Sequence, residues 1–318
     1  MEKFIDHELV ISEISLETPL VKTFEIRRRD GGALPPFEAG AHLRIKTPNG
    51  LIRKYSLTNS AEENHRYLIA VKREANGRGG SRSLWDEAKV GDPVQVSAPS
   101  NSFELVEKAR SYVFIAGGIG ITPLLSMIRT MGEMPHAPWK LYYLTSNKEN
   151  TPFHAELVSG QYPGKVVIHH TEGKPNNRFD LWPVLEKENT AHVYCCGSNG
   201  LMEDVRDMSG HWSPGNIHFE SFDDAAAIKP DDKPFQVKCA KSRIQLEVPV
   251  GKTILECLSE QGVNIPFSCE SGTCGTCKTD LLAGEVDHRD FVLLPEEKSH
   301  KIMVCVSRAK GEAIEIDV

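Results

Sequence analysis

The feature that most constrains this chain is a dense group of cysteines in "SCESGTCGTC" at 268–277. Three of them follow the spacing C-x4-C-x2-C, and a fourth stands in "IMVCVSRAK" after 27 intervening residues: Cys269, Cys274, Cys277 and Cys305. Three thiolates on one loop with a fourth from elsewhere is the plant-type pattern of [2Fe–2S] ligands. Gly272 and Gly275 allow the backbone to wrap closely and to aim amides at the cluster sulfurs. The pattern predicts an electron-transfer site.

Other roles for these thiols fit the spacing less well. Zinc sites usually have paired C-x2-C knuckles or histidines, and neither accompanies these cysteines. A thioredoxin-like dithiol would need only "CGTC" and would leave Cys269 and Cys305 without a role. Disulfides are disfavoured because we expect a cytoplasmic protein: "MEKFIDHELV" has no basic start followed by an apolar run.

Composition excludes two classes of protein. The 318 residues have a formal charge of −7 and a pI near 6.0, which argues against a basic, nucleic-acid-binding face. The longest uncharged stretch, 112–128, is interrupted by three glycines and Pro123, so it reads as strand, turn and helix rather than as a membrane span. We therefore expect neither a nucleic-acid nor a membrane partner.

The length suggests two or three domains, and the patterns divide the chain. Alternating stretches separated by turns, from "LVISEISLET" at 9–18 to "DPVQVSAPS" at 92–100, predict the strands of an antiparallel β-barrel over 1–108. Apolar strands that alternate with helical or turn segments predict an α/β domain with a parallel sheet over 109–222. A polar, proline-containing linker would occupy 223–233, and a β-grasp plant-type ferredoxin domain would occupy 234–318.

Two stretches of the α/β domain could bind a nucleotide. "AGGIGITP" at 116–123 places Gly117, Gly118 and Gly120 between a strand and a helix start, where backbone amides can meet a phosphate. It is not the G-x-G-x-x-G fingerprint, so a turn needed only for packing stays open. "YCCG" at 194–197 ends a later strand and should open on the same crevice, although free cysteines are often plain buried residues.

Two stretches of the barrel could bind a flavin. "RKYSLTN" at 53–59 offers Arg53, Tyr55 and Ser56 on one strand: a phosphate clamp, a stacking ring and a hydrogen-bond donor. The loop "GRGGSRS" at 77–83 offers amides, serines and arginines as a nest for a phosphate monoester. Without context, each stretch also reads as an ordinary amphipathic strand or glycine-rich loop.

Taken in order, these motifs resemble the phthalate dioxygenase reductase family of the ferredoxin–NADP⁺ reductase superfamily, across essentially the whole chain. The likeness includes "AVKREANGRGGS", "GHW", "HFESF", "DHRD" and "IMVCVSRAK". It implies an FMN barrel, an NADH-binding domain and a [2Fe–2S] domain in one NADH-dependent oxidoreductase. Electrons would pass from NADH to FMN, to the cluster and then to a transient partner, a Rieske-type terminal oxygenase that hydroxylates an aromatic ring. The reductase would be a monomer.

The resemblance also implies roles for individual residues. The catalytic residues would be Ser56, Thr122, Cys196 and Phe222, with Thr122 where flavin and nicotinamide meet, Cys196 beside the nicotinamide and Phe222 covering the flavin. The cofactor-binding residues would comprise these four together with Arg53, Tyr55, Ala70, Val71, Lys72, Gly80, Ser81, Arg82, Ser83, Gly117, Gly118, Gly120 and Gly197.

Several alternatives remain open. The chain could be a ferredoxin-type electron carrier without flavin, or the reductase of a vanillate-demethylase- or carnitine-monooxygenase-type oxygenase. A reductase of a diiron monooxygenase usually carries its ferredoxin domain first, so the C-terminal cluster argues against it. We expect FMN rather than FAD. We expect NADH rather than NADPH, because Lys148 is the only base in "YYLTSNKENT" and the next strand ends in "HHTEG" with the acidic Glu172. Acidic residues near the cluster predict a docking face: Glu270, Asp280, Glu285, Asp287 and Asp290.

Overall fold

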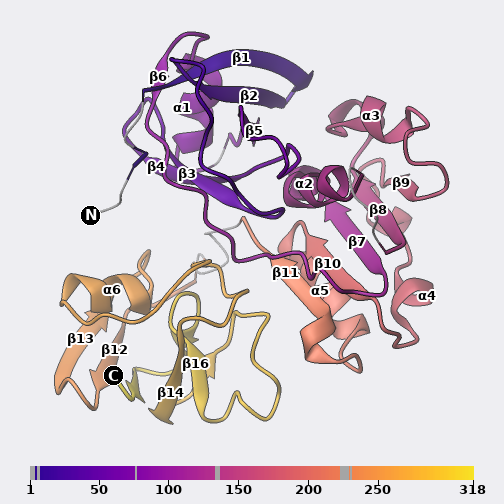
Figure 1. Cartoon of the computed structure of the whole chain (residues 1–318). Coiled ribbons are helices and arrows are strands. Elements are labelled where there is room, and N and C mark those ends of the chain that lie inside the picture. Colours follow the sequence, from indigo (N-terminus) through magenta and orange to yellow (C-terminus); the bar gives the residue numbers. More distant parts are fainter. Residues whose placement is uncertain (1–3, 6–7, 76, 133–136, 223–228, 230) are drawn as a thin grey trace. The chain divides into compact units, whose positions relative to one another are not determined.

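The computed structural model describes residues 4–5, 8–75, 77–132, 137–222, 229 and 231–318. It divides into two compact units, Met1–His218 and Phe219–Val318 (Figure 1). The first unit contains the antiparallel barrel and most of the α/β domain, and the second contains the cluster loop. The predicted multidomain class, with barrel, parallel sheet and ferredoxin module, is confirmed.

The barrel wall consists of a four-stranded sheet of order β5-β2-β1-β6 and the antiparallel pair β3-β4. Bridges Ile45↔Val96 and Leu57↔Ile69 join the two sheets around an apolar core. The strands are β1 (Leu9–Thr18), β2 (Val21–Arg28), β3 (His42–Lys46), β4 (Ile52–Ser56), β5 (Tyr67–Lys72) and β6 (Pro93–Val94).

Two details of the barrel differ from the pattern. The stretch 92–100, predicted as a strand, contributes only Pro93–Val94 to β6, and its remainder joins the wall through isolated bridges. The supposed loop at 77–83 runs into a helix, α1 (Gly80–Glu87). The helix buries Gly80, Ser83 and Leu84, which are three and four residues apart and so share one face. The sequence analysis missed this helix, because its glycines and polar residues leave too few apolar positions to show a helical period.

The α/β domain has a five-stranded sheet of order β11-β10-β7-β8-β9, in which β10, β7, β8 and β9 run parallel. Its strands are β7 (Tyr112–Gly117), β8 (Trp139–Thr145), β9 (Val166–His170), β10 (His192–Cys196) and β11 (Ile217–Glu220). Its helices are α2 (Ile121–Gly132), α3 (His154–Val158), α4 (Trp182–Leu185) and α5 (Asn199–Met208), with short 3-10 turns η1 (Gly118–Gly120), η2 (Lys148–Asn150), η3 (Pro175–Asn177) and η4 (Pro214–Asn216).

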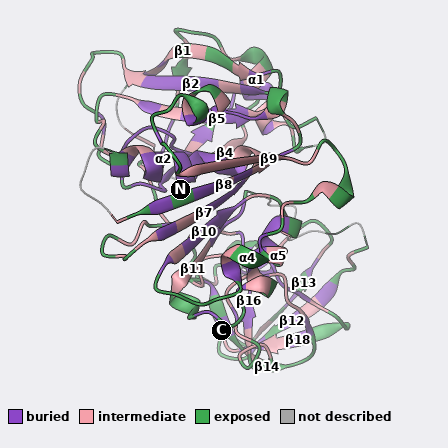
Figure 2. Cartoon of the chain, turned by 90° about the vertical axis from the view of Figure 1, so that its right-hand side faces the viewer, coloured by how far each residue is buried: buried purple, intermediate pink, exposed green. Residues whose placement is uncertain are grey.

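This sheet is buried on both faces, as a parallel sheet requires. Alternate residues Phe114 and Ala116 of β7 share a core with helix α2, while Ile115 between them is fully buried outside that core. Figure 2 shows the central strands mostly in the buried colour. The carboxyl ends of β7 and β10 therefore emerge from a packed layer, as a rigid platform for the loops that follow.

The second unit has a mixed sheet of order β13-β12-β18-β14-β16, with β12 and β18 parallel. Helix α6 (Ile254–Glu260) begins at Thr253, whose hydroxyl and the Glu256 carboxylate form a reciprocal capping box. The strands are β12 (Phe235–Cys239), β13 (Ile244–Val248), β14 (Lys278–Ala283), β15 (Val286–Asp287), β16 (Lys301–Met303), β17 (Arg308–Ala309) and β18 (Ala313–Ile316).

The predicted linker 223–233 falls largely outside the described residues, but its end is anchored within the second unit. Asp232 accepts two hydrogen bonds from the Arg289 guanidinium, and both side chains are more than nine-tenths buried. Lys229 pairs with Asp287, which also pairs with Arg289. The predicted domain boundaries otherwise stay predictions. Among the described residues, no helix has the length and apolar character needed to cross a membrane.

Candidate flavin, nucleotide and iron–sulfur sites

The four predicted cluster cysteines converge in the second unit. The Cys269 sulfur contacts the thiols of Cys274 and Cys305, and the Cys277 sulfur contacts Cys305. Cys274 is half-buried and the other three are buried. Residues separated by up to 36 positions thus bring their sulfurs into one cluster, as the spacing predicted.

The loop is shaped to present backbone donors to these sulfurs. The amides of Ser271 and Thr273 each donate to Cys269 Sγ at 3.4 Å. Hydrogen bonds from Cys274, Cys305, Thr273 and the Ser271 amide hold the pKa of the Cys269 thiol below its ordinary value. The same contacts raise the pKa of the Cys274 and Cys305 thiols, whereas the amides of Ser271 and Thr273 donate to Cys269 and favour its thiolate, the form that ligates iron.

Gly272 has the left-handed conformation that a tight loop needs, with φ of 74°. A Cβ on it would lie 2.8 Å from Val306 Cγ2 and 3.1 Å from Asp290 Cα, so a larger residue would push the loop away from its support. The Phe291 amide donates to the Gly272 carbonyl. Asp290, the last residue of "DHRD", and Phe291 after it therefore support the cluster loop, a role that the sequence did not reveal.

The thiol chemistry suits a two-iron cluster. Among the residues that the structure describes, no group of three or more histidine, cysteine or carboxylate side chains is arranged to hold one metal ion. A [2Fe–2S] cluster places two ligands on each iron and does not require three around one point. The contacts Cys269–Cys274, Cys269–Cys305 and Cys277–Cys305 join four thiols, enough for two ligands on each of two irons.

The predicted acidic docking face is wrong at one position. Asp290 is 3% exposed, and its Oδ1 accepts the amides of Val292 and Leu293. Asp287 is engaged by Arg289 and Lys229. These carboxylates support the fold, because Asp287 meets a lysine 58 positions away in the sequence and Asp290 accepts amides of its own turn.

The two barrel motifs come together at the start of helix α1. A Cβ on Gly80 would lie 2.6 Å from Arg53 Cγ and 2.9 Å from its Nε, so the Arg53 side chain lies directly against the first residue of the helix. Alternation along β4 places Arg53 and Tyr55 on one face. A guanidinium beside a helix N-terminus is a suitable environment for a phosphate.

The predicted nest at 77–83 is thus the entry to a helix. Gly79 takes a left-handed conformation at the N-cap without a side-chain cap, and the Ser83 amide makes the first intrahelical bond to Gly79. The amides of Gly80, Ser81 and Arg82 precede that bond, as the first-turn donors of a helix do. Arg82 is exposed, whereas Ser83 is buried.

The serine hydroxyls of this turn have internal contacts. Ser83 Oγ accepts the Asn49 amide at 3.0 Å, and the Asn49 side chain donates to Gly79. Ser81 Oγ accepts the Glu74 amide at 3.4 Å. Asn49 therefore ties the β3–β4 turn to α1, and sequence reasoning missed it, although the turn sequence "TPNG" signalled its conformation. Phosphate binding by Ser81 and Ser83 stays a prediction.

Tyr55 contributes a buried hydroxyl that has no hydrogen-bond partner within the described structure. Burial raises its pKa to about 12, and the nearby Arg53 charge opposes the rise. Buried polar atoms are rarely left unpaired, so an orphan atom beside Arg53 is compatible with a bound molecule that supplies a partner. Ser56, the last residue of β4, is buried. The residues fit a flavin phosphate and ring.

The flavin and nucleotide stretches are adjacent inside the first unit. Strand β5, which contains Ala70, Val71 and Lys72, contacts the η1 turn Gly118–Gly120. Ala70 also belongs to the core formed by α2 and the parallel sheet. A molecule along the β5 backbone would thus reach the turn that was predicted to bind the nucleotide.

The two nucleotide stretches pack at the carboxyl edge of the sheet. A Cβ on Gly120 would lie 2.2 Å from the Cys196 carbonyl oxygen, and one on Gly197 would lie 3.0 Å from Gly117 Cα. Only glycine allows the ends of β7 and β10 to approach this closely. The glycines therefore have a packing role, and they also leave backbone accessible at the carboxyl ends of the parallel strands, where α/β sheets bind their ligands.

Thr122 and Cys196 are both buried at this edge. The Thr122 hydroxyl donates to the Ile119 carbonyl at 3.0 Å and so fixes the start of α2. Burial raises the pKa of the preceding Cys195 thiol. Phe222, by contrast, lies in the second unit with 41% of its surface exposed, and its predicted cover of the flavin is untested.

The region predicted to select the nicotinamide cofactor lies where β8 and β9 end. The Glu172 amide donates to the Ser146 carbonyl at 2.7 Å, which fixes an acidic residue beside Ser146. Glu172 has φ of 51°, a left-handed turn. A carboxylate in this place favours a ribose hydroxyl over a 2′-phosphate.

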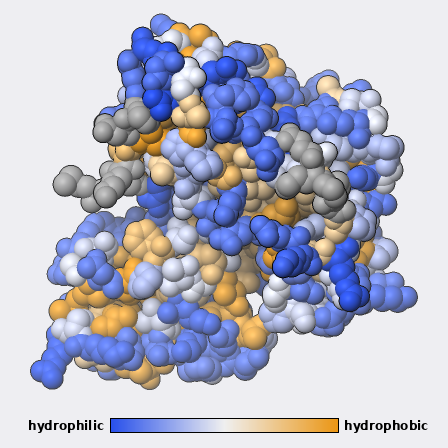
Figure 3. Space-filling view, in the orientation of Figure 1, coloured by the Kyte–Doolittle hydropathy of each residue, from blue (hydrophilic) through white to orange (hydrophobic). Residues whose placement is uncertain are grey.

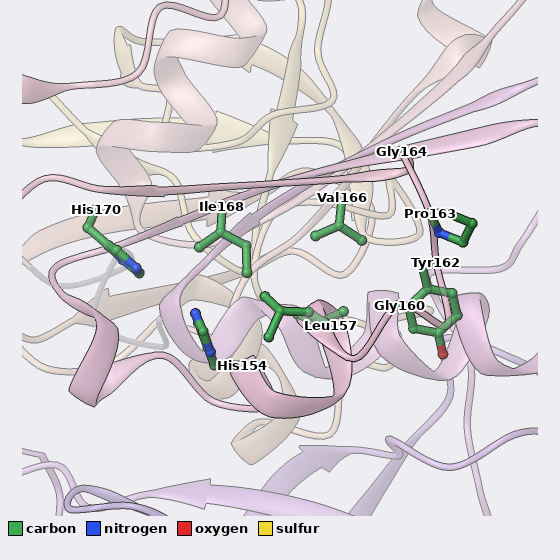
Figure 4. A pocket seen from close by; sticks show the side chains of 10 residues that line it. His154, Leu157, Gly160, Tyr162, Pro163, Gly164, Val166, Ile168 and His170 are labelled. Carbon is green, nitrogen blue, oxygen red and sulfur yellow. The ribbon is translucent and has the colours of Figure 1, made fainter.

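A separate cavity of about 400 Å³ lies between α3 and β9. Figure 4 shows Val166, Ile168 and His170 projecting from β9 toward Leu157 and His154. None of its lining residues was predicted as a site residue. It is distinct from the flavin, nucleotide and cluster stretches.

Comparisons with known proteins identify the domains of the chain. An "oxidoreductase NAD-binding domain" model matches residues 114–207, and a "2Fe-2S iron-sulfur cluster binding domain" model matches 237–310. The chain is 50% identical over 296 residues to a phthalate 4,5-dioxygenase reductase subunit of Pseudomonas putida, covering 93% of this chain and 91% of that protein. It is 50% identical over 297 residues to phthalate dioxygenase reductase of Burkholderia cepacia, covering 93% and 92%.

A solved structure of a phthalate dioxygenase reductase shows the same architecture. It aligns with a TM-score of 0.73 and 46% identity, over 99% of this chain and 98% of that one. It is described as a modular structure for electron transfer from pyridine nucleotides to [2Fe–2S]. The likeness spans barrel, α/β domain and cluster domain together.

Proposed function

We propose that this chain, which belongs to the phthalate dioxygenase reductase family, supplies electrons from NADH to a Rieske-type oxygenase that acts on phthalate or a similar aromatic acid. It is an NADH-dependent iron–sulfur flavoprotein oxidoreductase, and its cofactors are FMN, a [2Fe–2S] cluster and NADH. The oxygenase type and the aromatic acid are the proposed parts.

The first unit would bind both the flavin and the nucleotide. FMN, when bound, converts a two-electron hydride delivery into single-electron steps. Arg53 and the first amides of α1 would hold its phosphate, while Tyr55 and the β5 backbone at Ala70–Lys72 would flank its ring. Ser56, at the end of β4, would donate a hydrogen bond to the ring.

The glycine-rich edge of the sheet would hold NADH. The amides of Gly117, Gly118 and Gly120 would face its phosphates, with Gly197 allowing close approach. Thr122 and Cys196 are buried there and would exclude water from the nicotinamide. The observation that carries this assignment is the contact of β5 with the Gly118–Gly120 turn, because it puts the proposed flavin strand beside the proposed nucleotide turn.

Electrons would leave through the half-buried side of the cluster loop. Cys274 is the least buried of the four ligands, and Thr276, Pro266 and Phe267 nearby in the chain are exposed, Phe267 with 48% of its surface. Apolar residues are visible among hydrophilic ones on the second unit in Figure 3. A small patch with an aromatic residue suits a brief contact between redox partners.

The decisive experiment is stopped-flow reduction of purified Rieske oxygenases by the NADH-reduced protein. Phthalate dioxygenase should be reduced fastest, with vanillate- and carnitine-type oxygenases as comparisons. Failure to reduce any Rieske protein would refute the partner class.

We further propose that the reductase is a cytoplasmic monomer that binds its oxygenase transiently. Sedimentation of the reductase alone and of its mixture with the oxygenase tests this proposal.

A further inference from the structure

One face of helix α2 is hydrogen-bonded to the chain that leaves strand β4. Ser126 Oγ donates to the Asn59 carbonyl at 2.8 Å, and Arg129 Nη1 donates to the Thr58 carbonyl at 2.8 Å. Thr130 Oγ1 accepts the Ala61 amide at 2.9 Å. Ser126, Arg129 and Thr130 are three and four residues apart, so they form one stripe on the helix.

The Ser126–Asn59 bond is buried, and the bonds Arg129–Thr58 and Ala61–Thr130 are partly buried. Ser126, Thr58 and Asn59 are fully buried, and Thr130 is 7% exposed. Thr130 also donates to the Ser126 carbonyl, so its hydroxyl serves both partners. Loss of one partner would leave a buried donor or acceptor unpaired, which is unfavourable because no water replaces the lost bond.

Arg129 extends the connection to a second helix. Its Nε donates to Glu156 Oε1 at 3.0 Å and its Nη2 to Oε2, a two-pronged pair with α3. Its guanidinium also lies over the Phe153 ring. The Phe153 amide donates to Glu17 of β1. The barrel is thus fixed to α2 and α3 from two directions.

The location of this stripe matters because of what lies at its ends. Helix α2 begins beside Thr122, only four residues before Ser126, about one helical turn or 6 Å. Strand β4 ends at Ser56, two residues before Thr58. The stripe therefore connects the proposed nicotinamide position to the proposed flavin position over a few residues on each side.

We propose that Ser126, Arg129 and Thr130 are positioning residues that set the approach of nicotinamide to flavin. The inference rests on the proposed function of the first unit and adds residues that touch neither cofactor. Because they fix Thr58–Ala61 to α2, they keep the distance between Ser56 and Thr122 constant. Hydride transfer depends steeply on such geometry, because misplacement by about 1 Å can cost on the order of a hundredfold in rate.

The test uses the complete protein with its cofactors and two pairs of variants. Arg129→Gln removes the bond to Thr58, and Arg28→Gln is its matched control in the barrel. Arg28 also makes a two-pronged pair, with Asp30, and a bond to a carbonyl, with a side chain 20% exposed against 21% for Arg129. Thr130→Val removes the hydroxyl, and Thr130→Ser keeps it.

Arg129→Gln and Thr130→Val should lower the single-turnover rate of flavin reduction by NADH at least tenfold, while FMN content and the NADH dissociation constant stay within twofold. The long-wavelength charge-transfer absorbance between NADH and flavin should weaken. Amide hydrogen exchange at residues 57–61 should accelerate, a readout independent of activity. Thr130→Ser and Arg28→Gln should behave as the wild type.

Three results would overturn the inference. One is faster exchange at 57–61 with unchanged flavin reduction and charge-transfer absorbance. Another is an equal loss in Arg28→Gln, since that would indicate general destabilisation. The third is a wild-type protein that binds FMN but does not accept hydride from NADH, which would overturn the proposed function as well. If Arg129→Gln does not fold, the Thr130 pair decides.

Discussion

Gly80 lies against the side chain of Arg53, so close that a Cβ on Gly80 would stand 2.6 Å from Arg53 Cγ. The contact joins the first turn of α1 to strand β4 across 27 positions of sequence. It places a guanidinium beside the first-turn amides of a helix, and together they form the proposed phosphate site.

Replacing Gly80 by alanine should weaken FMN binding at least tenfold, because the new methyl group must displace Arg53. Fluorescence titration of the apoprotein with FMN measures the change. Gly215→Ala is the control, since nothing lies within 4 Å of its Cβ position. Unchanged affinity in Gly80→Ala would exclude Arg53 from the phosphate site.

Cys274→Ser should remove or destabilise the cluster, because one of its four thiolates is lost. Reduction of ferricyanide through the flavin should persist while reduction of cytochrome c falls at least tenfold. Cys257→Ser in α6, a buried cysteine of the same unit outside the cluster set, should keep the visible iron–sulfur spectrum. An intact spectrum in Cys274→Ser would show that the ligand assignment is wrong.

Stability of the first unit should fall in mild acid because of His218. Burial, aided by the neighbouring His192, lowers its pKa to about 4. The folded state then keeps the ring neutral between pH 6.5 and 4, where the unfolded state binds a proton. The contribution of His218 to the free energy of unfolding is therefore fully present above pH 6.5. It is lost progressively as the pH falls to about 4, by at most about 3 kcal/mol.

Urea unfolding followed by circular dichroism across this pH range measures the slope. His218→Phe should flatten the curve, whereas His65→Gln, at an exposed position, should not. A wild-type curve without slope between pH 6.5 and 4 would contradict the assignment.

NADH should be preferred over NADPH by at least roughly tenfold in kcat/KM, about 1.4 kcal/mol. The Glu172 amide bonds to the Ser146 carbonyl, which fixes an acidic residue at the edge where we expect the adenosine ribose. The double variant Ser146→Arg with Glu172→Gln should reduce the preference. Lys187→Gln, far along the chain and exposed, is the charge control. Equal kcat/KM values for both nucleotides in the wild type would refute the prediction.

Phe267→Ala should raise the KM for the oxygenase severalfold without changing the flavin reduction rate, because it removes the exposed aromatic residue beside the cluster loop. Leu282→Ala, at a similarly exposed position (52%), is the control in the same unit.

Electron delivery to the oxygenase should slow as ionic strength rises, because salt screens the steering that Glu270 and Glu285 would provide. A salt-independent rate would confine docking to apolar contact.

The sequence by itself determined the chemistry of the cluster and the order of the domains. Ligation of the cluster requires four thiolates at fixed spacing, and three of these lie within nine residues. The ligand set can therefore be recognised in the sequence alone. Strands β1 and β7 could also be predicted from the sequence, because the alternation of apolar and polar residues, or an apolar run between turns, is a local property. The nucleotide-binding edge of the parallel sheet could be predicted only in general terms, because the residues that pack against its glycines lie far away in the sequence.

Tertiary structure alone decided which residues support those sites. Asp290 has the charge of a surface residue but is buried, because amides of its own turn meet its carboxylate. Helix α1 packs Leu84 into the barrel core and brings Gly80 against Arg53, 27 positions away in the sequence. Arg129 bonds to Thr58 across 71 positions. Burial and hydrogen bonding depend on which distant segments meet, and that information resides in the packed fold rather than in any short window of sequence.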